Sequence, residues 1–124
     1  EKNKRNELTE HAISHRPWGY FENISSNETH KIKKLTVMPG KKLSLQSHNK
    51  RSEHWVVISG VASVTKGDKE FMLHKDESTF IPAKVKHRLT NKSKSLLVII
   101  EVQTGKYFGE DDIKRYEDKY GRIN

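Results

Sequence analysis

Short stretches of alternating or apolar residues, separated by turn residues, run through most of this 124-residue chain. Pro39–Gly40 and Lys66–Gly67–Asp68 are the clearest turn signals between them. The stretches that predict strands are residues 32–38, 42–48, 55–58, 61–65, 69–73, 79–81, 87–90 and 96–102. Many short strands joined by turns favour an all-β fold, either a barrel or a double-sheet jelly roll.

The composition favours a single folded domain with a very polar surface. Hydrophobic and charged residues each make up 32% of the chain, and the apolar ones gather in the predicted strands. Cysteine is absent from the sequence, which excludes disulfides and thiolate metal ligands. The longest apolar run, residues 96–100, is too short to cross a bilayer, so we expect a cytoplasmic protein without a membrane partner.

The formal net charge of +8 comes from lysines and arginines that are scattered along the chain rather than gathered in blocks. Basic charge attracts nucleic acid, anionic lipid or phosphorylated small molecules. Because no basic block and no alternation of arginine with aromatic residues appears, we expect a solvated basic surface. A preference for anionic substrates is the second interpretation, and we expect no nucleic-acid partner.

The N-terminal segment differs from the strand-rich middle of the chain. Residues 1–15 are polar with few apolar positions, and we interpret them as a linker or N-terminal extension. The domain then covers residues 16–124, which Pro17 opens with a turn and Trp18 with a first apolar anchor.

The C-terminal segment has a helical rather than a strand-like pattern. Acidic residues 110–112 precede Ile113, Tyr116 and Tyr120, which recur at helical spacing. Acids in a first turn favour a helix, so the pattern predicts a short C-terminal helix. Either a lid packed on the end of the barrel or a direct role in a site fits this segment.

Polar residues share one face of the strand predicted at 42–48. Gln46 and His48 are two positions apart and therefore lie on the same face. A polar inner face needs a reason, because buried polar groups are costly unless they are paired, and a bound metal would supply one. Glu53 lies at the start of the next strand and His87 in a second cluster, so the four residues could form a mixed nitrogen and oxygen site suited to zinc, manganese or cobalt.

A lone histidine on a strand is more often structural than a ligand, and the metal hypothesis therefore depends on the spacing of the whole set. That spacing resembles the two sequence motifs of the cupin family. The first motif corresponds to Gly40, Gln46, His48, Glu53 and Gly60, and the second to Asp76, Pro82, Lys84, His87 and Asn91. Asp76 and Lys84 stand where the second motif has glycines, so the turn geometry there departs from the family pattern.

Further sequence blocks narrow the resemblance to the type II mannose-6-phosphate isomerases. The blocks are residues 16–19 (RPWG), 43–46 (LSLQ), 51–55 (RSEHW), 108–113 (FGEDDI) and 115–122. The resemblance covers nearly everything from Arg16 onward. It implies a cupin barrel (a double-stranded β-helix) that holds one divalent metal, zinc or else cobalt or manganese, through Gln46, His48, Glu53 and His87.

The resemblance also implies a reaction and a substrate. Type II isomerases interconvert mannose 6-phosphate and fructose 6-phosphate, a step toward GDP-mannose and polysaccharide precursors, so the expected partner is a small phosphosugar. In many bacteria the domain follows a mannose-1-phosphate guanylyltransferase domain. No nucleotidyltransferase motif is present here, so we expect this chain to lack that activity.

Three residues are the candidates for catalysis beside the metal. Arg51 stands two positions before the expected ligand Glu53, and Lys42 shares the metal-facing parity of its strand, so both could bind substrate oxygens or stabilise an enediolate. Glu101 interrupts an apolar strand and could be a base or a positioning group.

Other residues have weaker assignments from the sequence. The cations around His87, namely Lys84, Lys86 and Arg88, could bind the substrate phosphate. Trp18, Trp55 and Phe71 are expected in the core, with Trp55 also able to line the cavity. An apolar outer face would favour a homodimer.

Three alternative functions remain at the level of the sequence. A cupin that binds metal or sugar and is inactive alone is the main alternative, and isomerase activity of the isolated chain would decide against it. An iron oxygenase or a sugar-nucleotide epimerase would lack the RPWG and GEDDI blocks. A nucleic-acid module would bind with a steep salt dependence.

Overall fold

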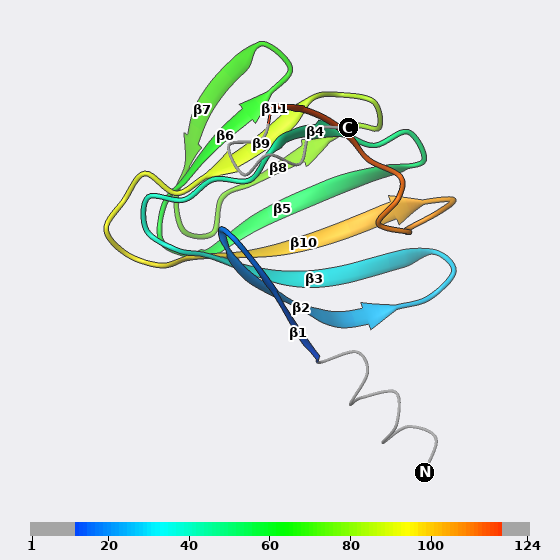
Figure 1. The fold of residues 1–124 in the computed structure, drawn as a ribbon, viewed down its shortest axis with the longest axis horizontal. Helices are drawn as coiled ribbons and strands as arrows, with labels where there is room; N and C mark the ends of the chain where they lie inside the picture. The colour runs from blue at the N-terminus through cyan, green and yellow to red at the C-terminus, as the bar shows by residue number, and fades with distance from the viewer. Residues whose placement is uncertain (1–11, 118–124) are drawn as a thin grey trace.

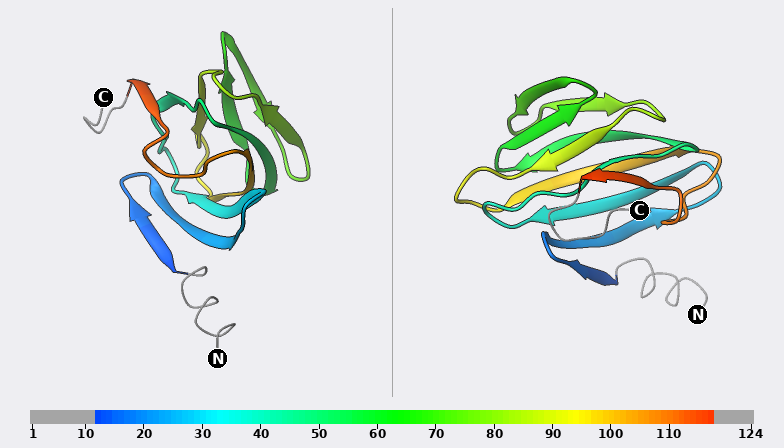
Figure 2. Two further views of the ribbon diagram at one scale, coloured as in Figure 1. Left: turned by 90° about the vertical axis from the view of Figure 1, so that its right-hand side faces the viewer. Right: turned by 45° about the horizontal axis from the view of Figure 1, so that its top comes forward.

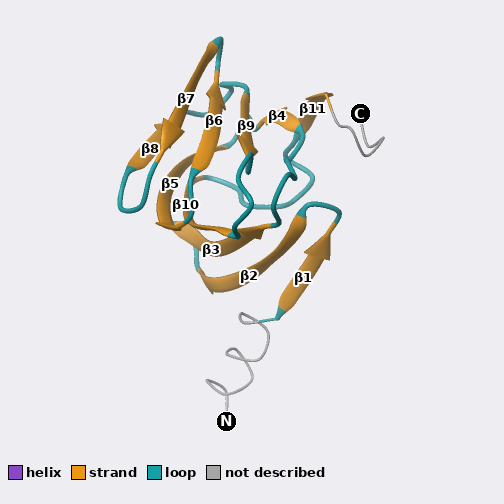
Figure 3. Cartoon of the chain, turned by 90° about the vertical axis from the view of Figure 1, so that its left-hand side faces the viewer, coloured by secondary structure: helices purple, strands orange, loops and turns teal. Residues whose placement is uncertain are grey.

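The computed structural model describes residues 12–117, and within them every regular element is a strand (Figures 1 and 3). The strands are β1 (Ile13–Arg16), β2 (Gly19–Ser26), β3 (His30–Val37), β4 (Leu45–Ser47), β5 (Arg51–Ser59), β6 (Ala62–Lys66), β7 (Lys69–Leu73), β8 (Ser78–Ile81), β9 (His87–Thr90), β10 (Leu97–Gly105) and β11 (Lys114–Glu117). No helix in this part of the chain is long and apolar enough to cross a membrane.

The strands form two sheets that curve toward each other (Figure 2). The larger sheet has the order β1-β2-β3-β10-β5-β8 and the smaller one the order β11-β4-β9-β6-β7, and all pairs are antiparallel. Strands far apart in sequence are therefore neighbours, as β3 and β10 are. The all-β double-sheet fold expected from the turn-separated segments is confirmed.

One part of the interior between the sheets is an ordinary apolar core. Alternate residues of the central strands point inward, as the buried Val57 and Ile99 illustrate at facing positions of β5 and β10. The buried apolar side chains are Trp18, Phe21, Leu35, Val37, Trp55, Val57, Ala62, Val64, Leu73, Ile81, Leu89, Leu97 and Ile99, with Phe71 packed against them. The expected core positions of Trp18 and Trp55 are confirmed.

Another part of the interior is polar on the same inward-facing parity. Glu53 is 2% exposed, Glu101 is 7% exposed and Gln103 is fully buried. Lys33 is also buried, and it lies directly opposite Glu101 across the β3–β10 pair. Burying so many polar groups is costly unless they are paired. This polar part of the interior is therefore the candidate functional site.

The expected C-terminal helix is wrong for the part that the structure describes. The amide of Asp112 donates to the Gly109 carbonyl across 3.2 Å, which closes a single turn, and the chain then continues as β11. Pairing with β4 explains the difference, because an otherwise unpaired strand edge offers hydrogen bonds that helical spacing alone does not reveal. Tyr120 lies outside the described residues.

The N-terminal boundary also differs from the expectation. Ile13–Arg16 pairs with β2 as a hairpin, so the sheet begins inside the segment interpreted as a linker. Residues 1–11 lie outside the described part of the chain.

Two loops keep a glycine-like backbone without glycine. Asp76 and Lys84, the two positions where the second motif lacks its glycines, both have φ of 73°. The turn geometry of the motif is therefore preserved at the cost of a left-handed conformation that side chains disfavour. At Gly60 the glycine is required, because φ is 88° and a Cβ there would lie 2.5 Å from the Leu96 carbonyl oxygen.

Candidate metal centre and substrate cavity

The pairing of three strands sets the site residues of the smaller sheet in one row. Gln46 of β4 lies directly opposite His87 of β9 on one side and Arg115 of β11 on the other. Residues directly opposite each other in an antiparallel pair share a face, and His87 is buried between the sheets, so all three face the interior. Glu53, Trp55 and Glu101 face them from the larger sheet.

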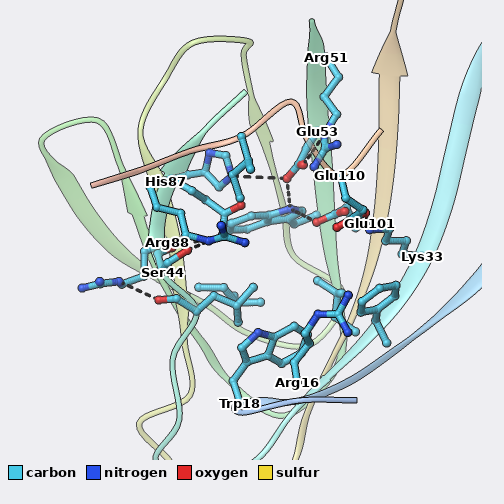
Figure 4. Close-up of a pocket in the computed structure, with 18 residues that line it drawn as sticks. Arg16, Trp18, Lys33, Ser44, Arg51, Glu53, His87, Arg88, Glu101 and Glu110 are labelled. Atoms are coloured by element: carbon cyan, nitrogen blue, oxygen red, sulfur yellow. Dashed lines mark hydrogen bonds and ion pairs between the residues drawn. The ribbon is translucent and has the colours of Figure 1, made fainter. Parts of the chain in front are cut away.

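Three of the four expected metal ligands converge. His48, Glu53 and His87 are buried and offer ligand atoms that all lie within 4.8 Å of one another. His48 Nε2 is 3.3 Å from Glu53 Oε2. His87 Nε2 is 3.7 Å from Glu53 Oε1 (Figure 4). The spacing of the two sequence motifs therefore located residues that the fold brings together from β5, β9 and the loop after β4.

Backbone carbonyls fix the orientation of both imidazoles. His48 Nδ1 donates to the carbonyl of Asp112 at 2.7 Å, and His87 Nδ1 donates to the carbonyl of Val85 at 3.1 Å. A carbonyl can only accept, so in the neutral rings the proton lies on Nδ1 and the lone pair on Nε2 points at Glu53. Metal-binding histidines are usually held by such contacts.

The cluster fits a divalent cation on the chemistry of its donors. Burial, followed by the nearby charges of Arg51 and His87, lowers the pKa of His48 to about 4, so this imidazole is neutral at pH 7. A neutral Nε2 and a carboxylate oxygen 3.3 Å apart are two acceptors, which here share the Arg51 guanidinium as a donor and which are also the atoms that a metal would bind. Two imidazole nitrogens and one carboxylate suit zinc and similar metals.

A cavity lies beside this cluster, and Glu53 and His87 line it. Gln46, the fourth expected ligand, lines the same cavity. Its amide nitrogen donates to the carbonyl and the hydroxyl of Ser44 at 3.3 and 3.2 Å. An amide binds a metal through its oxygen, so the Ser44 contacts hold the nitrogen away and leave the oxygen as the ligand atom. Gln46 as a ligand stays a prediction.

Arg51 and Trp55 hold the carboxylate of Glu53. Arg51 is buried, and its Nε donates to Glu53 Oε2 at 3.2 Å while a terminal nitrogen lies 3.3 Å from His48 Nε2. Trp55 Nε1 lies 3.1 Å from both Glu53 Oε1 and Glu101 Oε1. The expected place of Arg51 beside the ligands is thus matched by direct contacts, and Trp55 lines the cavity as expected.

Glu101 is a buried carboxyl group in the wall of the cavity. The Gln103 amide donates to its Oε2 at 2.6 Å, and Trp55 donates to its Oε1. Burial, and after it the charge of Glu53, raises the pKa of Glu101 above its usual value. A carboxyl group with a raised pKa beside a cavity is suited to proton transfer near neutral pH.

The segment 109–113, none of whose residues was assigned to the site from the sequence, contacts His48 and Arg51 and lines the cavity through Glu110 and Ile113. Asp112 orients His48 through its carbonyl, and its carboxylate accepts the amides of Asn49 and Lys50 at 3.0 and 2.9 Å. Glu110 pairs with Lys33 at 2.6 Å. This segment therefore contacts the candidate site, and the choice between a lid and a direct role stays a prediction.

Lysines expected at the site lie elsewhere. Lys42 forms an isolated bridge with Thr90, because β4 begins only at Leu45, and it is not among the residues that line the cavity. Lys84 and Lys86 are exposed and also do not line it. Arg88 borders the cavity, but it alternates with the inward-facing His87 and Leu89, and its Nε donates to the Leu43 carbonyl at 3.0 Å.

The chain has the fold of the cupins, a double-stranded β-helix. The chain superposes on the capsular polysaccharide assembling protein CapF of Staphylococcus aureus with a TM-score of 0.76 and 19% identity, over 86% of this chain and 34% of the other. A double-stranded β-helix protein of Klebsiella pneumoniae gives 0.74 and 15%, over 90% and 95% of the two chains. The Cnp3 cupin domain of Schizosaccharomyces pombe gives 0.71 and 13%, over 79% and 71%.

Within that class, the chain belongs to the family described as mannose-6-phosphate isomerase C-terminal, whose model matches residues 3–118. It is 51% identical over 118 residues to the xanthan biosynthesis protein XanB of Xanthomonas campestris pv. campestris, covering 95% of this chain and 25% of that protein. It is 50% identical over 118 residues to the alginate biosynthesis protein AlgA of Pseudomonas aeruginosa, covering 95% and 24%.

A third relative is named for a different activity. The chain is 45% identical over 121 residues to the mannose-1-phosphate guanylyltransferase RfbM of Salmonella typhimurium, covering 98% of this chain and 25% of that protein. The chain thus spans about a quarter of the length of these curated relatives.

Proposed function

We propose that this chain is a metal-dependent aldose–ketose isomerase that interconverts mannose 6-phosphate and fructose 6-phosphate, in the supply of GDP-mannose and polysaccharide precursors. The observation that carries the proposal is the convergence of two oriented imidazoles and one carboxylate beside the buried Glu101, in a cavity lined by arginines. Membership in the isomerase family and relatives named for xanthan and alginate biosynthesis support the same substrate.

The residues of the cavity divide the chemistry between them. A divalent metal held by His48, Glu53 and His87, with Gln46 as a fourth ligand, would supply a Lewis acid that polarises the sugar carbonyl. Glu101 takes the proton from C2 of the aldose and returns it to C1, while the hydroxyl proton of O2 passes to O1, which gives the ketose. Trp55 and Gln103 hold its carboxylate in place for both transfers.

Arg51 supplies positive charge beside the reacting carbons. Its guanidinium is buried and fixed by Glu53 and by the Gly109 carbonyl at 3.4 Å. A buried, pre-oriented cation stabilises an enediolate more than a mobile surface lysine would, because little reorganisation is needed when the negative charge develops.

The test is a coupled assay of mannose 6-phosphate isomerisation on the metal-stripped chain, repeated after addition of zinc, cobalt or manganese. We expect turnover to return with metal and to be absent in His48→Ala. Glu101→Gln should bind the metal as the unsubstituted chain does, while kcat falls by about 100- to 10,000-fold. Tight metal binding with no turnover for any of the three metals would refute the proposal.

A second candidate is a metal- or sugar-binding cupin domain that is inactive alone. The specific observation in its favour is that the chain spans only a quarter of its relatives. It predicts metal binding without turnover in the assay above, and recovery of turnover when the chain is embedded in a full-length protein.

A further inference from the structure

We infer that Arg16 and Arg115 form an anion subsite that binds the phosphate of the substrate, on the side of the barrel where β1 and β11 lie. The sugar end of the ligand then faces His48, Glu53 and His87. The identity of the sugar rests on the proposed function, whereas the binding of phosphate by these two arginines can be tested without it.

The two arginines come from the edge strands that flank the same side of the molecule. Arg16 ends β1, the edge of the larger sheet, and Arg115 lies on β11, the edge of the smaller sheet. Figure 3 shows β1 and β11 on the same side of the barrel, opposite β7 and β8. Both arginines line the cavity that also contains Glu53 and His87.

Arg115 is held facing the interior and has an unsatisfied donor. It lies directly opposite Gln46, which in turn lies opposite His87, so its side chain shares their face. Its Nε is inaccessible to solvent and lacks a hydrogen-bond partner within residues 12–117. Buried donors are nearly always paired, and an anionic oxygen in the cavity would supply the missing acceptor.

Arg16 is exposed at the rim, where its guanidinium stacks on an aromatic ring. Its Cζ lies 4.9 Å from the centre of the Phe21 ring, and one terminal nitrogen donates to the neighbouring His15 carbonyl at 2.9 Å. Figure 4 shows its guanidinium pointing into the cavity. Stacking fixes the plane of the guanidinium and leaves other N–H groups at its edge for an anion.

Two of the other cations that line the cavity have acidic partners, and a third, Arg88, donates to the Leu43 carbonyl at 3.0 Å. Lys33 pairs with Glu110 at 2.6 Å and Arg51 with Glu53 at 3.2 Å. Within the described residues, Arg16 and Arg115 form no ion pair with a carboxylate. Their charge, unlike that of Lys33 and Arg51, is not balanced by a carboxylate of the described residues and can attract a dianionic ligand.

The experiment is a titration of the metal-stripped chain with inorganic phosphate, followed by NMR chemical shifts, because a bound metal would itself attract phosphate. We expect Arg16→Gln and Arg115→Gln each to raise the dissociation constant by about tenfold or more. Lys84→Gln is the matched control. It removes a cation close to His87 in sequence but outside the cavity, and the constant should stay within about twofold.

Different outcomes separate this subsite from the proposed reaction. The inference is overturned if phosphate does not bind, if the two arginine variants bind it as the unsubstituted chain does, or if Lys84→Gln is the variant that weakens binding. Arg115→Lys keeps the charge without the planar fork, and we expect it to recover part of the affinity. Arginine-dependent phosphate binding without isomerase turnover would uphold the subsite and refute the isomerase alone.

Discussion

His48 is both a candidate metal ligand and a buried titratable group. Its ring is 3% exposed, donates from Nδ1 to Asp112 and presents Nε2 to Glu53. Its place among the candidate ligands was predictable, because the spacing of Gln46, His48 and Glu53 is a local property of the sequence. The contact with Asp112 was not, because it joins residues 64 positions apart and depends on the fold.

The lowered pKa of His48 makes the stability of the metal-free protein depend on pH. The unfolded chain binds a proton near pH 6.5, whereas the folded protein does so only near pH 4, so acid favours the unfolded state across this window. We expect His48 to account for a loss of about 3 kcal/mol in unfolding free energy between pH 7 and pH 4.

Denaturant unfolding of the metal-stripped chain at several pH values measures this loss. His48→Gln should flatten the pH dependence, whereas His74→Gln, which changes an exposed histidine, should leave it unchanged. Parallel curves for the unsubstituted chain and His48→Gln would contradict the assignment.

Lys33 is a site residue that the sequence could have pointed to, because a lysine stands at a core-facing position of a predicted strand. It shares parity with Leu35 and Val37 in the predicted strand 32–38, and those two residues are buried. A lysine at a core position of a strand needs a partner, which the structure identifies as Glu110, 77 positions away. The anomaly was visible in the sequence, but its partner was not.

At the scale of elements, the turn and strand at residues 109–117 make contacts with the site that the predicted helix did not indicate. Asp112 fixes the loop after β4 through the amides of Asn49 and Lys50 and orients His48. These hydrogen bonds outweigh the partial burial that disfavours its charge, so the pKa of Asp112 is lowered. The helical spacing of Ile113 and Tyr116 carried no information about pairing with β4.

We expect Asp112→Ala to lower zinc affinity by about 10- to 100-fold, because the His48 ring loses the loop that orients it. Competition with a chelator measures the affinity.

Asp111→Ala is the matched control, since that carboxylate accepts from Tyr107 and does not contact the loop after β4, and its zinc affinity should not change. Asp112→Asn, which retains one acceptor oxygen, should lie between the two. Zinc binding by Asp112→Ala equal to that of the unsubstituted chain would refute the role.

The backbone is strained at Asp76 and Lys84, the two turn residues with φ of 73°. We expect Lys84→Gly to stabilise the protein by about 1 kcal/mol and Asp76→Gly by less, because aspartate tolerates the left-handed conformation better than lysine. Both side chains are exposed, so little packing is lost. Urea unfolding measures the change. Lys75→Gly, at an adjacent exposed position without positive φ, should instead destabilise, and the same sign for all three variants would contradict this account.

At the scale of the whole molecule, the sequence predicted the fold better than the cavity. The alternation of inward-facing and outward-facing side chains is local to each strand. The inward-facing residues of β3, β5 and β10 could therefore be assigned from the sequence alone. Which inward residues meet depends on the order of strands in the two sheets. Arg16 and Arg115 illustrate the limit, since they line one cavity from opposite ends of the described chain.

The outer face of the larger sheet carries an apolar patch on β5, β8 and β10, and we predict that a second copy of the chain covers this patch. Val56 and Ile100 lie opposite each other on this face and are half-buried, while Ile58 and Phe80 are 43% and 41% exposed. Phe80 lies on β8, the edge strand of the sheet, where two copies could meet.

Light scattering with size-exclusion chromatography tests this expectation. The unsubstituted chain should elute as a homodimer, and Phe80→Glu should shift it toward monomer, because each interface would then bury two carboxylates. Met72→Glu is the matched control, since Met72 is 47% exposed but lies on β7 of the smaller sheet. A monomeric unsubstituted chain, or a dimer that Phe80→Glu leaves intact, would refute the dimer through this face. If Met72→Glu alone dissociates the dimer, the interface lies on the smaller sheet instead.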